Sequence, residues 1–337
     1  MRFTLTAEQS AFRHAVHDLL AKECSMSVVR EAWEAPPGQL DRGVWNRLDE
    51  MGVTAILVPE SRAGLGLDEC ALVPVLEETG RCALPHPIVE SAMVAAPLGV
   101  SGLVATDLGG GLVSCAADAD LLLLRAGPAL RAYRPDEVAV TAVTTVDGAR
   151  RAGTVRPLAA GTLVTDDPAE IATAGLRGTV GVAAQLVGLA RRMLEITVAY
   201  VVERRQFGVP IGSFQAVKHH LANALVQIEF AAPAVSRAGH SLASRARTVA
   251  RDVSMAKALA GDAAAVTGRA ALQCHGAIGY TVEYDLQLLM KRAWALTRSW
   301  GDRAFHAEAV AAAITGRLDG ADPASCVRAP GSPEEKR

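Results

Sequence analysis

The chain has 337 residues, of which half are apolar, and a formal net charge of −2. This balance gives no electrostatic reason to expect a nucleic acid or an anionic membrane surface as partner. No apolar run reaches the roughly 18 residues that a membrane span needs, and no signal-peptide core is visible, so we expect a cytoplasmic protein without a membrane span. The spacing of the six cysteines matches neither a zinc site nor a disulfide framework, so we predict no metal site.

The first part of the chain has the pattern of a small all-helical domain, expected over residues 1–100. Thr6-Ala7-Glu8-Gln9 has the pattern of a capping box that opens a helix. Apolar residues at helical spacing predict a further helix at 70–79 and another at 88–98. Beyond Gly102 the helical pattern of apolar residues ends. Apolar and β-branched runs at 121–124, 138–146, 155 and 163–164 predict short strands in a shortened β middle domain over 101–167.

From Pro168 onward the pattern is helical again. Four long segments, 170–205, 214–246, 248–276 and 283–318, predict a C-terminal four-helix bundle over residues 168–320. Residues 321–337 are rich in proline, glycine and charge, so we expect a disordered tail. The expected fold class is therefore mainly α with a small β middle domain.

The least generic stretch of the chain is a charged break between two amphipathic segments. It reads Glu203-Arg204-Arg205-Gln206-Phe207-Gly208-Val209-Pro210-Ile211-Gly212-Ser213-Phe214-Gln215. Gly208, Pro210 and Gly212 favour the end of one helix and the start of the next. Arg204 continues the apolar stripe of the preceding segment, so its permanent charge needs an anionic partner such as a phosphate or a carboxylate. By itself the stretch also fits a helical hairpin with a solvated basic end.

Three further motifs accompany this stretch along the chain. The first is Phe3-Thr4-Leu5-Thr6 followed by Glu8-Gln9. The second is Trp45, Gly52, Val58-Pro59-Glu60 and Gly64-Leu65-Gly66-Leu67, followed by Glu77-Glu78-Thr79-Gly80-Arg81. The last, downstream of the charged break, is Gln273-Cys274-His275-Gly276-Ala277-Ile278-Gly279-Tyr280-Thr281. With these four motifs in this order, the sequence resembles the flavin-dependent acyl-CoA dehydrogenase family.

This resemblance implies a helical N-terminal domain, a β middle domain and a C-terminal four-helix bundle. It also implies a chemistry in which a carboxylate removes the α proton of an acyl-CoA thioester and FAD accepts the β hydride. Arg204 resembles the arginine on the FAD pyrophosphate. The other positions that match cofactor-contacting residues are Gln206, Phe207, Ile211, Gln215, Gln273, Gly276 and Ala277. In the family the loop that matches 273–279 approaches FAD from a neighbouring subunit, so we expect an oligomer with a shared FAD site.

Two departures from the family pattern separate this sequence from a complete enzyme. The glutamate base expected near the start of the last helix is replaced by Trp300, and an alternative position for the base falls on Gly178. An indole cannot accept a proton from carbon, so no catalytic residue is predicted in this chain. The alternative, Asp302, lies about 200° around a helix from Trp300, which favours a helix N-terminal carboxylate. The middle domain also lacks the family's flavin-packing turn, so we expect incomplete flavin and acyl pockets.

A further basic pair, Arg150-Arg151, follows Asp147-Gly148 and is interpreted as part of a solvated turn. A contact with a phosphate of CoA is the alternative.

The matches and the departures together favour one subunit of a heteromeric acyl-CoA dehydrogenase. The chain resembles the short, base-lacking chains that pair with a full-length homologue in actinobacterial steroid degradation. The expected partner is a homologous subunit that supplies the glutamate, in a heterotetramer, with self-association as a further possibility. Two alternatives stay open. The chain could be a structural subunit without flavin that stabilises a catalytic homologue, or a lone acyl-thioester enzyme with different chemistry.

Overall fold

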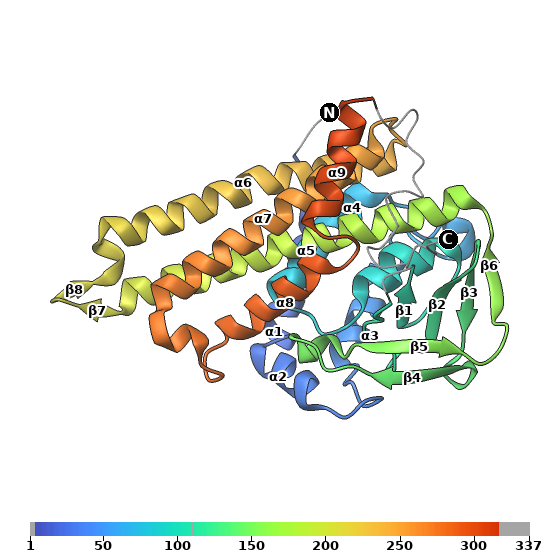
Figure 1. The fold of residues 1–337 in the computed structure, drawn as a ribbon, viewed down its shortest axis with the longest axis horizontal. Helices are drawn as coiled ribbons and strands as arrows, with labels where there is room; N and C mark the ends of the chain where they lie inside the picture. The colour runs from blue at the N-terminus through green and yellow to red at the C-terminus, as the bar shows by residue number, and fades with distance from the viewer. Residues whose placement is uncertain (1–3, 109–110, 317–337) are drawn as a thin grey trace, which may run out of the picture.

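The computed structural model describes residues 4–108 and 111–316, so the tail expected at 321–337 lies outside the described residues. Three long helices run side by side along the longest dimension of the molecule (Figure 1). They are α5 (Pro168–Glu203), α6 (Gln215–Ala243) and α7 (Val249–His275). The expected class, mainly α with a small β region, is confirmed. In the part of the chain that is described, no helix is long and apolar enough to cross a membrane.

The N-terminal region is built from four α-helices. They are α1 (Ala7–Glu23), α2 (Met26–Glu34), α3 (Gly43–Glu50) and α4 (Glu69–Arg81). The capping box is confirmed, because the Thr6 side chain accepts a hydrogen bond from the Gln9 N–H and the Gln9 side chain accepts one from the Thr6 N–H. The helix expected at 88–98 is instead a π-helix at Val89–Ala95 followed by a 3₁₀ turn at Ala96–Leu98.

The β region consists of a four-stranded sheet and a separate two-stranded ladder. In the sheet, β1 (Val104–Asp107) pairs in parallel with β2 (Leu121–Ala126), and β3 (Ala129–Tyr133) pairs antiparallel with both β2 and β6 (Thr162–Thr165). The ladder joins β4 (Val138–Ala142) to β5 (Gly153–Pro157). All the runs expected as strands contribute to these strands, whereas β1 and β3 were not predicted. The sequence of β3, Ala-Leu-Arg-Ala-Tyr, has no β-branched residue, and pairing on both sides holds it in the sheet.

The N-terminal region and the bundle share one core, and α4 and α5 approach each other unusually closely within it. A Cβ atom added to Gly188 would lie 1.9 Å from the backbone oxygen of Glu77, and one added to Gly80 would lie 2.2 Å from that of Gln185. Only glycine allows such an approach of two backbones. In the same contact, the Gln185 side-chain amide donates to the Thr79 hydroxyl at 3.1 Å. The helical N-terminal region is thereby fixed to the first half of α5.

Two buried arginines join the β region to the helices around it. Arg151 donates to the carboxylate of Asp118 at 2.8 Å and to the carbonyl oxygen of Ala35 at 2.6 Å. Arg292, in α8 (Leu286–Arg298), is paired with Asp147 and donates to the carbonyl oxygen of Leu84. The interpretation of 150–151 as a solvated turn is therefore wrong, because the turn lies between α2 and α8 and its charges have partners there.

The last expected helix, 283–318, is interrupted. The interruption separates α8 from α9 (Arg303–Ile314), and at it Trp300 and Gly301 have positive φ angles of 56° and 90°. These angles lie outside the right-handed helical region, so the helix cannot continue through them. Asp302 caps α9, because its carboxylate accepts a hydrogen bond from the Phe305 N–H at 3.0 Å. The structure thus gives Asp302 the helix N-terminal role that the sequence favoured.

Candidate functional site

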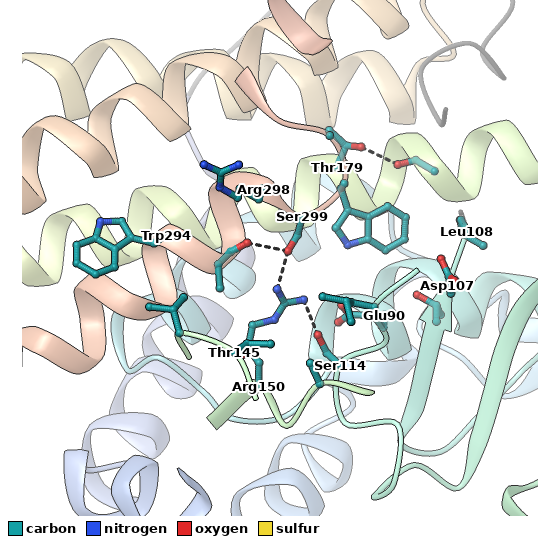
Figure 2. A pocket seen from close by; sticks show the side chains of 18 of the residues that line it. Glu90, Asp107, Leu108, Ser114, Thr145, Arg150, Thr179, Trp294, Arg298 and Ser299 are labelled. Carbon is teal, nitrogen blue, oxygen red and sulfur yellow. Dashed lines mark hydrogen bonds between the residues drawn. The ribbon is translucent and has the colours of Figure 1, made fainter. Parts of the chain in front are cut away.

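A pocket of about 500 Å³ lies between the β region and the helices α5 and α8. Its walls come from the π-helix, from β1 and the segment after it, from the turn between β4 and β5, from the first turns of α5, and from the α8–α9 junction (Figure 2). This size falls in the usual range for small-molecule sites. A cavity is therefore present although the β region is short, and it is lined by a mixture of apolar and polar side chains.

Glu90 places a carboxyl group in this pocket, from the π-helix. Burial raises the pKa of the Glu90 carboxyl, while the nearby Arg150 guanidinium acts in the opposite direction. Isolated π-helical turns are rare and occur frequently at functional sites. The sequence contained a signal for Glu90, since it is the one charged residue within the mainly apolar run 88–98. The sequence analysis took this run only as a helix.

Arg150 extends its guanidinium into the same pocket, beside Glu90 (Figure 2). It donates to the hydroxyl of Ser299 at 2.7 Å and to the hydroxyl of Ser114. Both partners are neutral, and within the described residues Arg150 forms no ion pair. Thr106 also lines the pocket and is only 7% exposed, and its buried hydroxyl has no hydrogen-bond partner in the described part of the chain. Sequence analysis identified neither of these groups as part of a pocket.

The two positions at which the resemblance placed a catalytic base lie against each other. A Cβ atom added to Gly178 would lie 2.5 Å from the six-membered ring of Trp300. The indole therefore occupies the space into which a side chain at position 178 would extend. Neither residue offers a carboxylate, and Trp300 fills part of the cavity wall. Its positive φ is a strained conformation for a bulky residue, and such strain often marks functional sites.

The strained turn at Trp300 and Gly301 is held by two buried residues of α7 and α9. The Lys257 ammonium donates to the carbonyl oxygen of Gly301 at 2.9 Å, and the His306 Nε2 lies 2.9 Å from the carbonyl oxygen of Trp300 as its hydrogen-bond donor. Burial lowers the pKa of Lys257 to about 7. Burial, assisted by Lys257, lowers the pKa of His306 to about 4.

These pKa values predict that acid destabilises the protein. His306 and the buried His86 each have a folded pKa of about 4, compared with an ordinary value of 6.5. Between these pH values the unfolded chain binds more protons than the folded chain does. The free energy of unfolding therefore falls as the pH falls from 6.5 to 4. Each histidine contributes on the order of 3 kcal/mol over the full window. Urea unfolding at a series of pH values is expected to give this slope.

The corresponding variants test which groups are responsible. His306→Asn and His86→Gln are each expected to flatten the dependence of stability on pH. His219→Gln changes an exposed residue of α6 and is expected to leave the slope as it is in the wild type. An unchanged slope in both buried-site variants would contradict the assignment to these histidines.

The residues expected to contact FAD lie at the other end of the bundle. The stretch after Glu203 forms a hairpin of β7 (Arg205–Gln206) and β8 (Val209–Pro210), which projects from the ends of α5 and α6 (Figure 1). Phe207, at its tip, is 93% exposed. Arg204 is exposed, and its guanidinium has no hydrogen bond or ion pair within the described residues. Gln206 and Gln215 are also exposed, whereas Ile211 is half-buried in the 3₁₀ turn that follows the hairpin.

The second set of expected cofactor residues lies at the same end of the molecule. Gln273, in the last turn of α7, and Ala277, in the 3₁₀ turn that follows, are exposed. Gly276 has φ 65° and ψ −139°, which only glycine adopts readily. No atom lies within 4 Å of a Cβ added to Gly276. The stacked rings of Tyr200 and His275, 4.4 Å apart, join the end of α5 to the end of α7. The structure therefore brings the two sets of residues to one end of the bundle.

The groups around Arg204 and Gly276 are suited to bind part of a dinucleotide, but they lie far from the pocket. An exposed guanidinium without a partner can take a phosphate, and the open backbone at Gly276 lets a ligand approach closely. The pocket, in contrast, is lined by Gly175 and Thr179 at the opposite end of α5. Twenty-five residues separate Thr179 from Arg204, which is about 37 Å along a helix. One FAD molecule cannot contact both places within one chain. In the described residues, no group of three or more His, Cys, Asp or Glu side chains could hold a metal.

Comparison with known proteins gives matches at both ends of the chain. A family model described as acyl-CoA dehydrogenase, N-terminal domain, matches residues 6–104, and one described as acyl-CoA dehydrogenase, C-terminal domain, matches residues 171–315. The chain is also similar to acyl-CoA dehydrogenase IpdE2 of Mycolicibacterium smegmatis. The two are 32% identical over 305 residues, which cover 86% of this chain and 93% of the relative.

Solved structures with a similar fold include one from a named complex. The fold is similar to that of a chain in the ChsE4–ChsE5 complex from Mycobacterium tuberculosis, with a TM-score of 0.82 and 22% identity, over 94% of this chain and 99% of that chain. It is also similar to a chain of the Tcur3481–Tcur3483 steroid ACAD G363A variant, with a TM-score of 0.79 and 22% identity, over 93% of this chain and 99% of that one. At this identity the similarity establishes the fold alone.

Proposed function

Because the chain belongs to the acyl-CoA dehydrogenase family, we propose that it is one subunit of a cytoplasmic FAD-dependent acyl-CoA dehydrogenase whose catalytic glutamate comes from a homologous partner chain. The observation that carries this proposal is the contact between Trp300 and Gly178. The two positions where a base would stand meet in space and are filled by an indole and a glycine. The α,β-desaturation of an acyl-CoA needs a carboxylate at that place, so another chain must provide it.

In this proposal the chain contributes the pyrophosphate end of a FAD site that lies between subunits. Arg204 supplies a forked guanidinium to the phosphates, Phe207 supplies an exposed ring, and Gly276 lets the cofactor approach the backbone. The remaining contacts come from Gln206, Ile211, Gln215, Gln273 and Ala277. Bound FAD supplies the acceptor for the hydride. The distance from Arg204 to the pocket of the same chain supports a site completed by a second chain.

The surface around the hairpin has the composition of a subunit interface. Large apolar side chains are exposed on the last turns of α5, on the hairpin and the turn after it, and along α6 as far as its middle: Val198, Val202, Phe207, Phe214, Leu225, Val226 and Phe230. Clusters of this kind on soluble proteins mark contact surfaces. The similar fold found in the ChsE4–ChsE5 complex agrees with a heteromer, and the steroid ACAD neighbour favours a steroid-derived acyl-CoA as substrate.

Arg204→Ala in a co-produced complex tests the proposed FAD contact. We expect the complex with a full-length homologue to contain flavin and to reduce a dye in the presence of acyl-CoA. Arg204→Ala is expected to weaken FAD binding by about 10- to 150-fold, because a charge-assisted contact of about 1.5–3 kcal/mol is lost. The measurement is flavin absorbance per complex after dilution.

Arg205→Ala is the matched control. The Arg205 guanidinium donates to the carbonyl oxygen of Gly208 within its own hairpin, so its removal is expected to leave the flavin content unchanged. Flavin and activity in this chain purified alone would contradict the need for a partner. An active complex whose flavin content does not respond to Arg204→Ala would instead indicate a structural subunit.

A further inference from the structure

Three aromatic rings meet at the hairpin end of the bundle, where α5, α7 and α8 come together. Tyr200 lies in the last turn of α5, His275 is the last residue of α7, and Tyr284 lies just before α8. The ring centroid of His275 is 4.4 Å from that of Tyr200, with the two planes stacked, and 4.8 Å from that of Tyr284. One imidazole therefore contacts both phenol rings, and none of the three belongs to the residues proposed to touch FAD.

Hydrogen bonds fix the orientation of the His275 ring and the position of its proton. Its Nδ1 lies 2.8 Å from the carbonyl oxygen of Ala271, which can only accept, so Nδ1 carries the hydrogen. In the neutral ring Nε2 is then an acceptor, and the Tyr284 hydroxyl donates to it at 3.1 Å. Burial lowers the pKa of the His275 imidazole, which favours this neutral form. The ring therefore cannot rotate without losing both bonds.

This cluster lies directly beside both groups of residues proposed to contact FAD. The Arg204 N–H donates to the carbonyl oxygen of Tyr200 at 2.9 Å, so Tyr200 lies in the helical turn that ends at the arginine. His275 is followed directly by Gly276. The contact between the two rings thus links the segment that carries the guanidinium to the glycine backbone that a ligand can approach. A ligand that touches both needs them at a fixed separation.

The segment between Gly276 and α8 is held by a second contact, which comes from α2. The Arg30 guanidinium donates to the carbonyl oxygen of Val282 at 2.6 Å and to the Asp285 carboxylate at 2.7 Å. The far end of this segment is therefore fixed to the N-terminal region, whereas its near end depends on His275. Loss of the contacts of His275 is then expected to free the near end without unfolding the segment.

We propose that His275 is a positioning residue for FAD. Stacked on Tyr200 and bonded to Tyr284, it holds the Gly276 backbone and the Arg204 guanidinium at the separation that the cofactor requires. This role rests on the proposed function, because the separation matters only if the chain contacts FAD. His275 is buried, so it acts through its neighbours. A site whose parts are already ordered binds more tightly, because less conformational freedom is lost on binding.

Three substitutions test this role in the complex co-produced with a full-length homologue. Tyr284→Phe keeps the ring and removes the hydroxyl, so FAD binding is expected to weaken by about three- to ten-fold. His275→Phe keeps a ring that can stack on Tyr200 and removes both hydrogen bonds, with an expected loss of about ten-fold or more. His275→Gln again provides an acceptor for the Tyr284 hydroxyl and is expected to bind FAD within about three-fold of the wild type.

FAD affinity and stability are measured separately, by flavin absorbance per complex after serial dilution and by urea unfolding of each variant chain. Tyr133→Phe is the matched control, because it removes a phenol hydroxyl in β3, near the start of α5 and away from the hairpin (Figure 1). It is expected to leave FAD binding unchanged. A purely structural role of His275 would lower stability and leave the FAD affinity of the folded complex as it is in the wild type.

Unchanged FAD affinity in either His275→Phe or Tyr284→Phe would overturn the positioning role, and so would equal losses in His275→Gln and His275→Phe. Arg204→Ala, measured in the same way, separates this role from the proposed function. A response to Arg204→Ala without one to the other variants leaves the shared FAD site standing and removes only the positioning role. If no variant responds, the proposed FAD contact is wrong and the positioning role with it.

Discussion

Asp147→Ala is expected to lower the free energy of unfolding by about 3–5 kcal/mol, the largest effect of any substitution considered for this protein. Asp147 is the counter-ion of Arg292, and both side chains are almost fully buried. Removing the carboxylate leaves a guanidinium charge in the interior whose remaining hydrogen-bond acceptors, among the described residues, are the carbonyl oxygens of Ala83 and Leu84. The contact also joins the turn between β4 and β5 to α8 and to the segment after α4. Its loss therefore weakens three regions at once.

A double-mutant cycle distinguishes the pair from its two members. Arg292→Met and the double variant are measured beside Asp147→Ala by urea unfolding. The double variant is expected to be more stable than Asp147→Ala, because no unpaired charge is left inside. Asp136→Ala removes one member of the fully exposed pair with Arg134 and is expected to leave stability unchanged. Additive effects of the two buried substitutions would show that Arg292 and Asp147 do not depend on each other.

Gly188→Ala is expected to lower the free energy of unfolding by about 3 kcal/mol. The added methyl group would lie 1.9 Å from the backbone oxygen of Glu77 and 2.9 Å from the backbone nitrogen of Arg81. Neither atom belongs to a flexible side chain, so α4 and α5 must separate and the core between them must loosen. Chemical unfolding of the purified variant measures this loss.

Gly261→Ala is the matched control for this substitution. Gly261 also lies inside a long helix, but the nearest atom to its added Cβ is 3.7 Å away, at the Thr297 side chain. Alanine there is expected to stabilise the protein by up to about 1 kcal/mol, since it has the higher helix propensity. A neutral result for Gly188→Ala would mean that α4 and α5 are free to move apart, and their close contact would then contribute little to stability.

Much of the architecture could be predicted because the long helices have strongly periodic apolar positions. The elements that were missed or misplaced depend on contacts that the sequence does not display. β3 is a strand because β2 and β6 pair with it on both sides. The break at Trp300 follows from positive φ angles that Lys257 and His306 hold in place, and Lys257 is distant in the sequence. The π-helix at Val89–Ala95 has the same apolar composition as an α-helix and could not be distinguished from one.

The candidate site could be predicted only where a motif marks it. The charged break at Glu203–Gln215 and the loop at Gln273–Ala277 were singled out from their residues, and the structure places both at one end of the bundle. Whether they contact FAD stays a prediction. Arg150 was misjudged because a basic pair after Asp-Gly is usually solvated, whereas here its guanidinium donates to the hydroxyls of Ser114, in the β region, and Ser299, at the end of α8. Thr106 carries no sequence signal at all, because a hydroxyl without a hydrogen-bond partner among the described residues is a property of the fold.

The 36-residue length of α5 has a consequence for the choice of partner. The length of this helix sets the distance between the pocket at its start and the β7–β8 hairpin at its end. Insertion of one residue would advance the hairpin by about 1.5 Å and turn it by about 100°. Where two chains meet so that each hairpin faces the other subunit, the corresponding helices of the two subunits must have the same length. Subunits with a helix of another length would place Arg204 out of register, so helix length itself would discriminate among related chains.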